Sequence, residues 1–306
     1  MGADIALTLA RAGSPTHLVE PLDAVRRSLP ARLAAGLAAL GAPGRVDFVQ
    51  VHGSLDALPW AQVDLVIEAV PEKLDLKRAI FAQLGARARP DAWLASNSSS
   101  FPISAIAEGV PGGHRTFGLH YFMPAHLVPL VEVVCGARSD PALAADLAQF
   151  MRTTGKVPVL VRKDLPGFLA NRLQHALARE AYSLIEQGVA TAADVDAAVR
   201  FGFGFRYLAA GPILQKDHAG LDVHAAAAAT MYPGLADDKA PSKVLTGLVA
   251  AGRLGMKTGA GFYDWTPEAI AKERARYEAL LRAGIDLLAP ELPKVEGAQE
   301  AALPRS

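Results

Sequence analysis

A histidine and a glutamate twelve positions apart are the residues of this chain whose types and spacing point most directly to chemistry. His120 lies in the run FGLHYF (117–122), and Glu132 lies in the run LVEVV (130–134). Both runs are short, apolar and bounded by prolines, which is typical of β-strands. A histidine and a carboxylate on neighbouring strands can form an oriented acid–base pair. The pair therefore predicts proton-coupled chemistry at a carbinol or carbonyl carbon.

The composition argues against several other classes of protein. The 306 residues include 31 basic and 31 acidic side chains, so no net positive field attracts nucleic acid or an anionic membrane. No apolar run reaches the ~20 residues of a membrane-spanning helix, and the N-terminus lacks the features of a secretory signal. The histidines at positions 114, 120 and 126 do not form a metal-binding motif. We predict a cytoplasmic protein that binds a small molecule and no metal, nucleic acid or membrane.

Strand-like and helical patterns alternate over the first part of the chain. Apolar runs of strand type lie at 17–20, 48–51, 65–70, 93–97, 117–122, 128–134 and 157–162. Helical patterns occupy 23–40, 73–86 and 141–154. This alternation predicts a mostly parallel sheet with helices on both faces, which binds ligands beyond the carboxyl ends of its strands. We assign residues 1–162 to an α/β domain of this kind.

The pattern changes after Pro166. Helical patterns follow at 168–187, 192–200, 218–230, 242–251 and 267–283, with Thr191 and Asp194 spaced as a capping box. We predict an all-α second domain over residues 163–289, with the junction in the segment KDLPG (163–167). The remaining residues, 290–306, are rich in Pro, Glu and Ala and predict a loose tail.

The opening segment carries part of a dinucleotide-binding pattern. Gly2 precedes a helical pattern, and Glu20 ends the strand-like run that follows it. In a Rossmann-type unit, the last glycine of GxGxxG lets the helix pack on the sheet, and an acid about 20 residues later binds the adenosine ribose. Gly2 and Glu20 match these two places. Glu20 favours NAD over NADP, because a carboxylate repels a 2′-phosphate.

The first strand and the first two glycines of that pattern are missing, since they would precede Met1. Two interpretations stay open. The chain begins at an internal methionine of a longer protein, or the protein has lost its pyrophosphate turn and binds nucleotide poorly. That turn offers backbone N–H groups to the diphosphate. The missing strand would lie centrally in the sheet, so its absence predicts unpaired strand edges.

Five segments, spread over most of the chain, carry further motifs. They are DLVIEAVPEKLDLKRAIF (64–81), ASNSSSFPIS (95–104), FGLHYFMPAHLVPLVEVV (117–134), KDLPGFLANRL (163–173) and GMKTGAGFY (255–263). As a set and in this order they resemble the L-3-hydroxyacyl-CoA dehydrogenase family of fatty acid metabolism. The resemblance implies a Rossmann-type domain for NAD and a helical domain that forms a homodimer. It also implies that Glu72, Lys77 and Asn97 line the nicotinamide and its ribose.

The same resemblance assigns the catalytic residues. His120 is similar to the family's catalytic base, and Glu132 is similar to the acid that orients it. Ser99 and Asn171 resemble the residues that hold the substrate oxygen. General chemistry is consistent with these roles, because a neutral imidazole accepts a proton near neutral pH and a neighbouring carboxylate stabilises the imidazolium. Ordinary roles stay open for Ser99 as a turn residue and for Asn171 as a helix cap.

Some features depart from the acyl-CoA enzymes of the family. Met123 stands where they have an asparagine after the histidine, and the segment between Glu20 and Leu65 is short and lacks lysine. The loop GFGFRYLAAGP (202–212) resembles the branch that includes lambda-crystallin-like dehydrogenases and enzymes acting on free acids or on a pyridine carboxylate. We therefore name Arg206 as a candidate for binding a substrate carboxylate through its guanidinium.

The sequence leads to three hypotheses. The first is an NAD-dependent dehydrogenase that interconverts an L-3-hydroxyacyl-CoA and its 3-oxo form. The second keeps the chemistry but acts on a free hydroxy acid or a pyridine-carboxylate alcohol. The third is a non-catalytic structural or binding protein with an incomplete nucleotide site.

Overall fold

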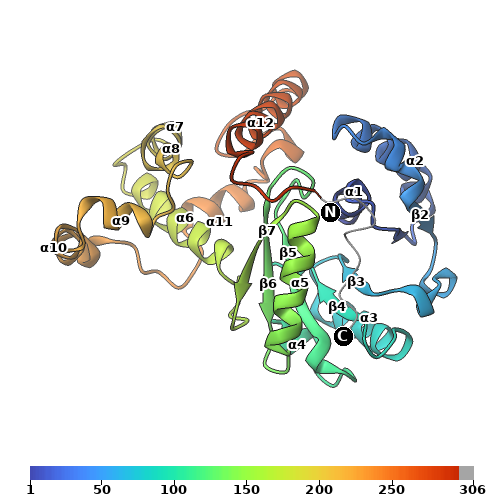
Figure 1. The fold of residues 1–306 in the computed structure, drawn as a ribbon. Coiled ribbons are helices and arrows are strands. Elements are labelled where there is room, and N and C mark those ends of the chain that lie inside the picture. The colour runs from blue at the N-terminus through green and yellow to red at the C-terminus, as the bar shows by residue number, and fades with distance from the viewer. Residues whose placement is uncertain (296–306) are drawn as a thin grey trace. The chain divides into compact units, whose positions relative to one another are not determined.

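The computed structural model describes residues 1–295, and these divide into two compact units. Unit 1 comprises Met1–Asn171 and returns at the end of the chain, from Leu281 onward, whereas unit 2 is Arg172–Leu280 (Figure 1). The predicted junction at 163 thus precedes the change of unit at Arg172. Of the predicted tail, 296–306 lie outside the described residues, and Val295 forms an isolated antiparallel bridge with Thr154.

Unit 1 contains a strand at each predicted strand position. These are β1 (Thr16–Val19), β2 (Val49–His52), β3 (Leu65–Glu68), β4 (Trp93–Ser96), β5 (Thr116–Tyr121), β6 (Leu130–Cys135) and β7 (Val157–Val161). They form a parallel pair, β1-β2, and a five-stranded sheet in the order β3-β4-β5-β6-β7. All pairings are parallel except β5 with β6, which is antiparallel. The expectation of a mostly parallel sheet is confirmed. The antiparallel pairing of the two strands that carry His120 and Glu132 was not predicted.

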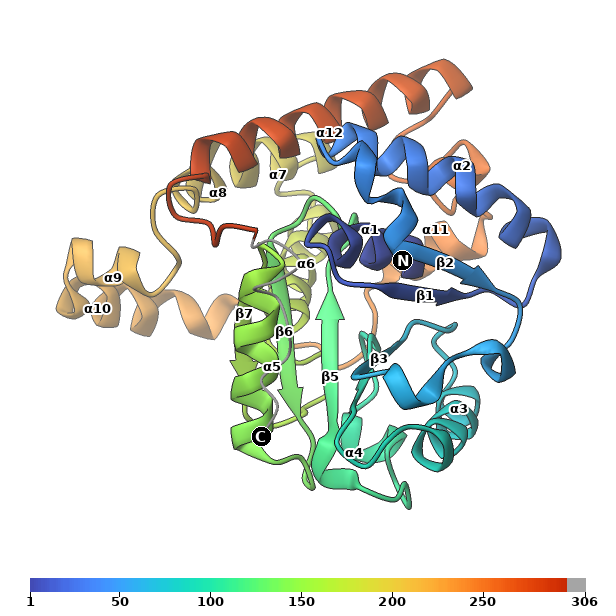
Figure 2. The ribbon, with the colours of Figure 1, turned by 45° about the vertical axis from the view of Figure 1, so that its right-hand side comes forward.

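Helices cover both faces of the five-stranded sheet (Figure 2). They are α1 (Gly2–Arg11), α3 (Leu74–Arg87), α4 (Ile103–Ile106) and α5 (Pro141–Thr153). The helix α2 (Asp23–Ala39), followed by the 3-10 turn η1 (Pro43–Phe48), packs instead on the strand pair β1-β2. Side chains of α1 and α5 pack with Phe117 and Val133 on one face. Side chains of α3 and α4 pack with Leu94 and Val134 on the other. Val133 and Val134, which are consecutive in β6, therefore belong to the cores on opposite faces of the sheet, because successive side chains of a strand point to opposite faces.

The helix α1 connects the strand pair to the larger sheet. Its Leu7 packs with α2 and β1, while its Ile5 belongs to the core of the five-stranded sheet. Gly2, at the start of α1, lies against both Leu18 of β1 and Ala69 just after β3. Within residues 1–295, no strand pairs with the second edge of β1 or with the outer edge of β3. The strand pair and the larger sheet thus remain two separate sheets.

Unit 2 is built from helices, as the sequence predicts. They are α6 (Ala170–Glu186), α7 (Ala192–Ala198), η5 (Val199–Phe203), α8 (Gly204–Arg206), α9 (Leu214–Ala219), α10 (Leu221–Met231), α11 (Lys243–Ala250) and α12 (Pro267–Leu288), of which α6 starts and α12 ends in unit 1. Thr191 and Asp194 form the predicted capping box. Among residues 172–280, all of which the structure describes, only Gly261 is buried. Unit 2 therefore has no apolar core of its own.

Nowhere in residues 1–295 is a helix long and apolar enough to cross a membrane.

Candidate active site

His120 and Glu132 face each other across the antiparallel pair β5-β6. They are directly opposed in the strand register, and His120 Nδ1 lies 2.7 Å from Glu132 Oε2. His120 is 2% exposed and Glu132 is fully buried. A carboxylate only accepts hydrogen bonds, so Nδ1 carries the ring proton and Nε2 is left as the acceptor. The arrangement orients a histidine whose Nε2 lone pair can take up a proton.

The second oxygen of Glu132 meets the start of helix α6. Glu132 Oε1 accepts hydrogen bonds from the backbone N–H groups of Leu169 (3.1 Å) and Ala170 (2.8 Å). Just before them, Gly167 and Phe168 both have positive φ angles, of 78° and 52°, which turn the chain toward the carboxylate. A positive φ is uncommon for a phenylalanine. The unpaired N–H groups at the N-terminus of a helix stabilise a negative charge, here that of the Glu132 carboxylate.

Two aromatic rings enclose the imidazole. The ring of Phe122 lies 4.5 Å from that of His120, and the ring of Phe168 lies 5.7 Å away, both in edge arrangements. Phe168 is 3% exposed, so it shields the histidine from water. No motif of the sequence pointed to a role for Phe168 or for the two amides. The acid in a β-strand and the Pro-Gly before a helix were the signals that could have suggested a capped carboxylate.

Ser99 and Asn171 lie beside the imidazole, as expected from the resemblance. Ser99 Oγ is 3.1 Å from His120 Nε2, and the tautomer makes the hydroxyl the donor. Asn171 Nδ2 donates to the backbone oxygen of Ser99 over 3.3 Å. The structure thus brings His120, Glu132, Ser99 and Asn171 into one hydrogen-bonded group.

Glu72 lies under the serine turn that carries Ser99. Its Oε1 accepts from the hydroxyls of Ser98 (2.7 Å) and Ser100 (2.8 Å) and from the backbone N–H groups of Ser99 (3.1 Å) and Ser100 (2.9 Å). Burial raises the pKa of Glu72, but these hydrogen bonds and the charge of Lys77 outweigh it and hold the pKa at about 2. The carboxylate is therefore ionised over the whole range in which the protein would work.

Lys77 is 1% exposed, although it lies on helix α3. Its ammonium group contacts Glu68 Oε1 (3.0 Å), Glu72 Oε2 (3.2 Å) and the backbone oxygen of Val70 (3.4 Å). Glu68 Oε2 also lies 3.3 Å away, so oxygens of Glu68, Glu72 and Val70 surround the three donors of the ammonium group. Asn97, also expected at the nicotinamide, accepts a hydrogen bond from the backbone N–H of Tyr121 over 2.9 Å. Glu68 was not singled out in the sequence, because a buried acid that follows apolar residues gives no local signal of its partner.

The residues at the start of α1 fit a dinucleotide. A side chain at Gly2 would lie 3.7 Å from Leu18 Cδ1, so the first turn of α1 runs close to the end of β1. The first N–H groups of a helix have no partner inside it and favour an anion such as a diphosphate. Glu20, directly after β1, accepts one hydrogen bond at Oε1 from the N–H of Leu22 (2.9 Å). Its other oxygen remains available to ribose hydroxyls.

Arg206 lies in unit 2, where it ends helix α8 and is exposed. Its proposed contact with a substrate carboxylate stays a prediction.

A buried lysine holds the connection between β5 and β6. Lys156, which is 4% exposed, donates to the backbone oxygens of Ala125 (2.5 Å) and Val128 (2.8 Å). Burial and the charge of Arg11 lower the pKa of Lys156 to about 7. The lysine thus ties the start of β7 to the loop between the histidine strand and the glutamate strand.

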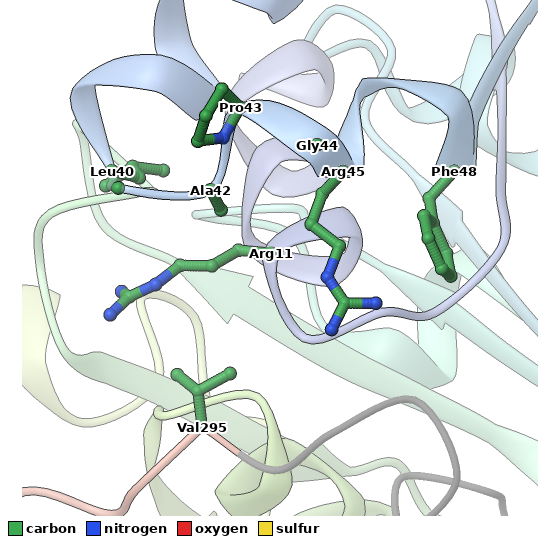
Figure 3. Close-up of a pocket in the computed structure, with 9 residues that line it drawn as sticks. Arg11, Leu40, Ala42, Pro43, Gly44, Arg45, Phe48 and Val295 are labelled. Carbon is green, nitrogen blue, oxygen red and sulfur yellow. The ribbon is translucent and has the colours of Figure 1, made fainter.

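A cavity of about 590 Å³ lies elsewhere in unit 1. It is lined by the end of α1 and by the turn between α2 and η1, and Arg11 and Arg45 extend along it (Figure 3). A smaller cavity of about 260 Å³ shares Arg11 and Leu40 with it and includes Lys156. None of the residues expected to bind cofactor or substrate lines either cavity. The candidate active site is therefore defined by the hydrogen-bonded group around His120.

Comparisons with known proteins identify the family of the chain. The 3-hydroxyacyl-CoA dehydrogenase NAD binding domain matches residues 1–165, and the C-terminal domain of the same family matches residues 167–265. A relative from Mesorhizobium japonicum, 5-formyl-3-hydroxy-2-methylpyridine 4-carboxylate 5-dehydrogenase, is 35% identical over 88% of this chain and 84% of its own length. The 3-hydroxybutyryl-CoA dehydrogenase of Mycobacterium tuberculosis is 35% identical over 87% of this chain and 95% of its own.

A solved structure also resembles this chain over most of its length. The crystal structure of a 5-formyl-3-hydroxy-2-methylpyridine 4-carboxylic acid 5-dehydrogenase, described as an NAD⁺-dependent dismutase, superimposes with a TM-score of 0.87 at 30% identity. The match covers 94% of this chain and 95% of that one. With both of its domains matched and relatives of this similarity, the chain belongs to the 3-hydroxyacyl-CoA dehydrogenase family.

Proposed function

We propose that this protein is an NAD-dependent dehydrogenase that interconverts an L-3-hydroxyacyl-CoA and its 3-oxo form. The observation that carries the proposal is the buried contact of 2.7 Å between His120 Nδ1 and Glu132 Oε2, with Nε2 directed at Ser99. This contact leaves Nε2 as a proton acceptor for a substrate hydroxyl. The family supplies the cofactor class, through its NAD binding domain.

The residues of this chain have separate tasks in the reaction. His120 takes up the hydroxyl proton at Nε2, and Glu132 stabilises the imidazolium that results. Ser99 and Asn171 hold the substrate oxygen with neutral donors as negative charge develops on it. Phe122 and Phe168 keep water from the imidazole. When bound, NAD accepts or supplies the hydride, and Glu20 and the start of α1 would hold its adenosine ribose and diphosphate.

A pyridine carboxylate or another free hydroxy acid is the second candidate for the substrate. The likeness to the pyridine-carboxylate dehydrogenase favours it, because that enzyme matches this chain with a TM-score of 0.87. The crystal structure of the Mycobacterium tuberculosis protein FadB2 matches this chain less well, with a TM-score of 0.71. Arg206 would bind the carboxylate of such a substrate through two parallel N–H···O bonds.

The apolar surface of unit 2 supports a homodimer as the working state. Large apolar side chains stay exposed there, among them Phe201 (70%), Phe205 (64%) and Ile213 (78%). A unit without a buried core cannot repay the entropy of ordering its chain. A second copy of the chain would cover these side chains. The balanced charge of the chain argues against a nucleic-acid or anionic-membrane partner, and we place the enzyme in the cytoplasm.

Substitution of the histidine tests the proposal. We expect His120→Gln to abolish NADH-dependent turnover of acetoacetyl-CoA while NADH still binds with nearly unchanged affinity. Parallel assays with acetoacetyl-CoA and with free acetoacetate or a pyridine carboxaldehyde distinguish the two substrate classes. Equal turnover in the variant would remove His120 from the mechanism. A wild-type protein that binds no NADH would instead support the non-catalytic hypothesis.

A further inference from the structure

We propose that the guanidinium group of Arg26 binds the adenine ring of the cofactor by stacking against it, next to the acid Glu20. The inference rests on the proposed binding of the adenosine ribose at Glu20. It gives the adenine a protein contact that no motif of the sequence indicated. Arg26, Glu20 and the other residues involved lie within unit 1.

Arg26 lies in the first turns of α2, and its side chain reaches back to the carboxyl ends of β1 and β2. These two strand ends are joined, because the backbone N–H of Glu20 donates to the backbone oxygen of His52 over 2.9 Å. A sheet with helices on its faces binds a dinucleotide beyond the carboxyl ends of its strands. The guanidinium group is therefore at the edge of the strand pair that a cofactor approaches.

Hydrogen bonds fix the plane of the Arg26 guanidinium group. Its Nη1 donates to the backbone oxygens of Glu20 (3.0 Å) and Pro21 (3.3 Å). Its Nη2 donates to Asp23 Oδ1, at the first residue of α2. The N–H groups of a guanidinium lie in its plane. These contacts therefore engage the edges of the group and leave its two faces for other neighbours.

Gly53, directly after β2, lies against one of the faces. A Cβ atom at Gly53 would lie 3.1 Å from Nη1, 3.3 Å from Cζ and 3.8 Å from Nε of Arg26. An atom beyond the edge of the group would be much farther from the central Cζ, so these distances place it over the face. The lack of a side chain at Gly53 lets the guanidinium lie flat on the backbone. Since the Arg26 side chain is still 29% exposed, the opposite face is what remains for a ligand.

An adenine ring fits this face in chemistry and in position. A guanidinium is a flat, delocalised cation that stacks well on aromatic rings. Adenine is joined directly to the ribose that Glu20 would bind, and Arg26 Nη1 already contacts the backbone of Glu20. A ribose held by the carboxylate thus brings its base to the start of α2. Because the plane is fixed before binding, little side-chain entropy is lost when the ring stacks on it.

Binding measurements with whole and truncated nucleotides test the proposal. We compare wild-type protein, Arg26→Gln and Arg26→Lys, using fluorescence for NADH and calorimetry for ADP. We expect both affinities to fall by about 5- to 20-fold in Arg26→Gln. Arg26→Lys should lose nearly as much, because an ammonium group keeps the charge but has no plane to stack. The affinity for reduced nicotinamide mononucleotide, which has no adenine, should not change.

Two further variants separate stacking from charge and from folding. Arg27→Gln removes the same charge from the next residue, which pairs with the other oxygen of Asp23 and is 79% exposed. It should leave the NADH affinity within about twofold of wild type. Gly53→Val keeps Arg26 but displaces its guanidinium group, so it should weaken NADH binding as Arg26→Lys does. Thermal melts of each variant show whether the fold is retained.

The outcomes separate this inference from the proposed function. An unchanged affinity for NADH and ADP in Arg26→Gln, or an equal loss for the mononucleotide, would overturn the stacking contact. An equal loss in Arg27→Gln would overturn it too, because the effect would then be one of charge alone. In these cases His120→Gln would still abolish turnover and the proposed function would stand. A wild-type protein that binds neither NADH nor ADP would contradict the nucleotide site itself.

Discussion

Glu132→Gln is the substitution that most directly tests the proposed role of His120 as the catalytic base. Glu132 accepts from the N–H groups of Leu169 and Ala170 at one oxygen and from His120 at the other. In the variant, the amide oxygen can keep the two backbone hydrogen bonds, which places the amide nitrogen against His120 Nδ1. An amide nitrogen donates, so Nδ1 must become the acceptor and the ring proton moves to Nε2. The histidine then presents a proton where the mechanism needs a lone pair.

The expected fall in kcat can be worked out from the contact between His120 and Glu132. In the wild-type protein the carboxylate stabilises the imidazolium through a contact of 2.7 Å. Two unit charges with centres about 4 Å apart interact by about 4 kcal/mol at an effective dielectric constant of about 20. Loss of that stabilisation lowers kcat by roughly 1,000-fold. The reversed tautomer raises the loss toward about 10,000-fold, the cost of the equivalent change in a serine-protease triad.

The assay measures kcat from the absorbance of NADH at saturating substrate. The NADH affinity and the thermal midpoint of unfolding are measured for each protein as well. We expect a large fall in kcat with unchanged NADH binding, because the side-chain hydrogen bonds of Glu132 go to the histidine and to the start of α6. Glu132→Asp serves as a control, because it keeps the charge and shortens the side chain. A folded Glu132→Gln protein that loses less than about tenfold in kcat would refute the proposed acid–base pair.

Three further predictions concern other parts of the molecule. Arg206→Ala should raise KM for a free acid more than for a CoA thioester, and steady-state kinetics with an unchanged KM for the acid would discard the carboxylate contact. The pKa of Lys156 is lowered to about 7 by burial and Arg11, so above that pH the unfolded chain holds more protons than the folded one and stability rises with pH. Urea unfolding should show the wild-type protein gaining about 2 kcal/mol relative to Lys156→Met between about pH 7.5 and 9.5, and parallel curves would contradict the lowered pKa of Lys156. The double variant Phe205→Ser with Ile213→Ser should shift the protein from dimer to monomer in light scattering, whereas an unchanged mass would mean that these exposed side chains do not form the contact.

Much of the fold was accessible from local patterns. The apolar runs at 65–70, 93–97 and 157–162 became β3, β4 and β7 with ends shifted by one or two residues. The capping box at Thr191 formed as predicted. These features depend on neighbours in the chain, through strand propensity and side-chain caps. Pairing depends on distant residues, so the separation of β1-β2 from the larger sheet and the antiparallel β5-β6 contact required the structure.

The candidate site likewise has features that the sequence predicts and features that only the structure shows. The sequence by itself determined which residues are the candidates for the chemistry: His120 and Glu132 on two apolar strands, and the serine turn with Ser99. Only the tertiary structure decided their partners, because the amides of residues 169 and 170 and the ring of Phe168 come from a segment far along the chain from the two strands. Side-chain types and short spacings are local properties, whereas burial and a defined hydrogen-bond partner exist only once the chain is packed.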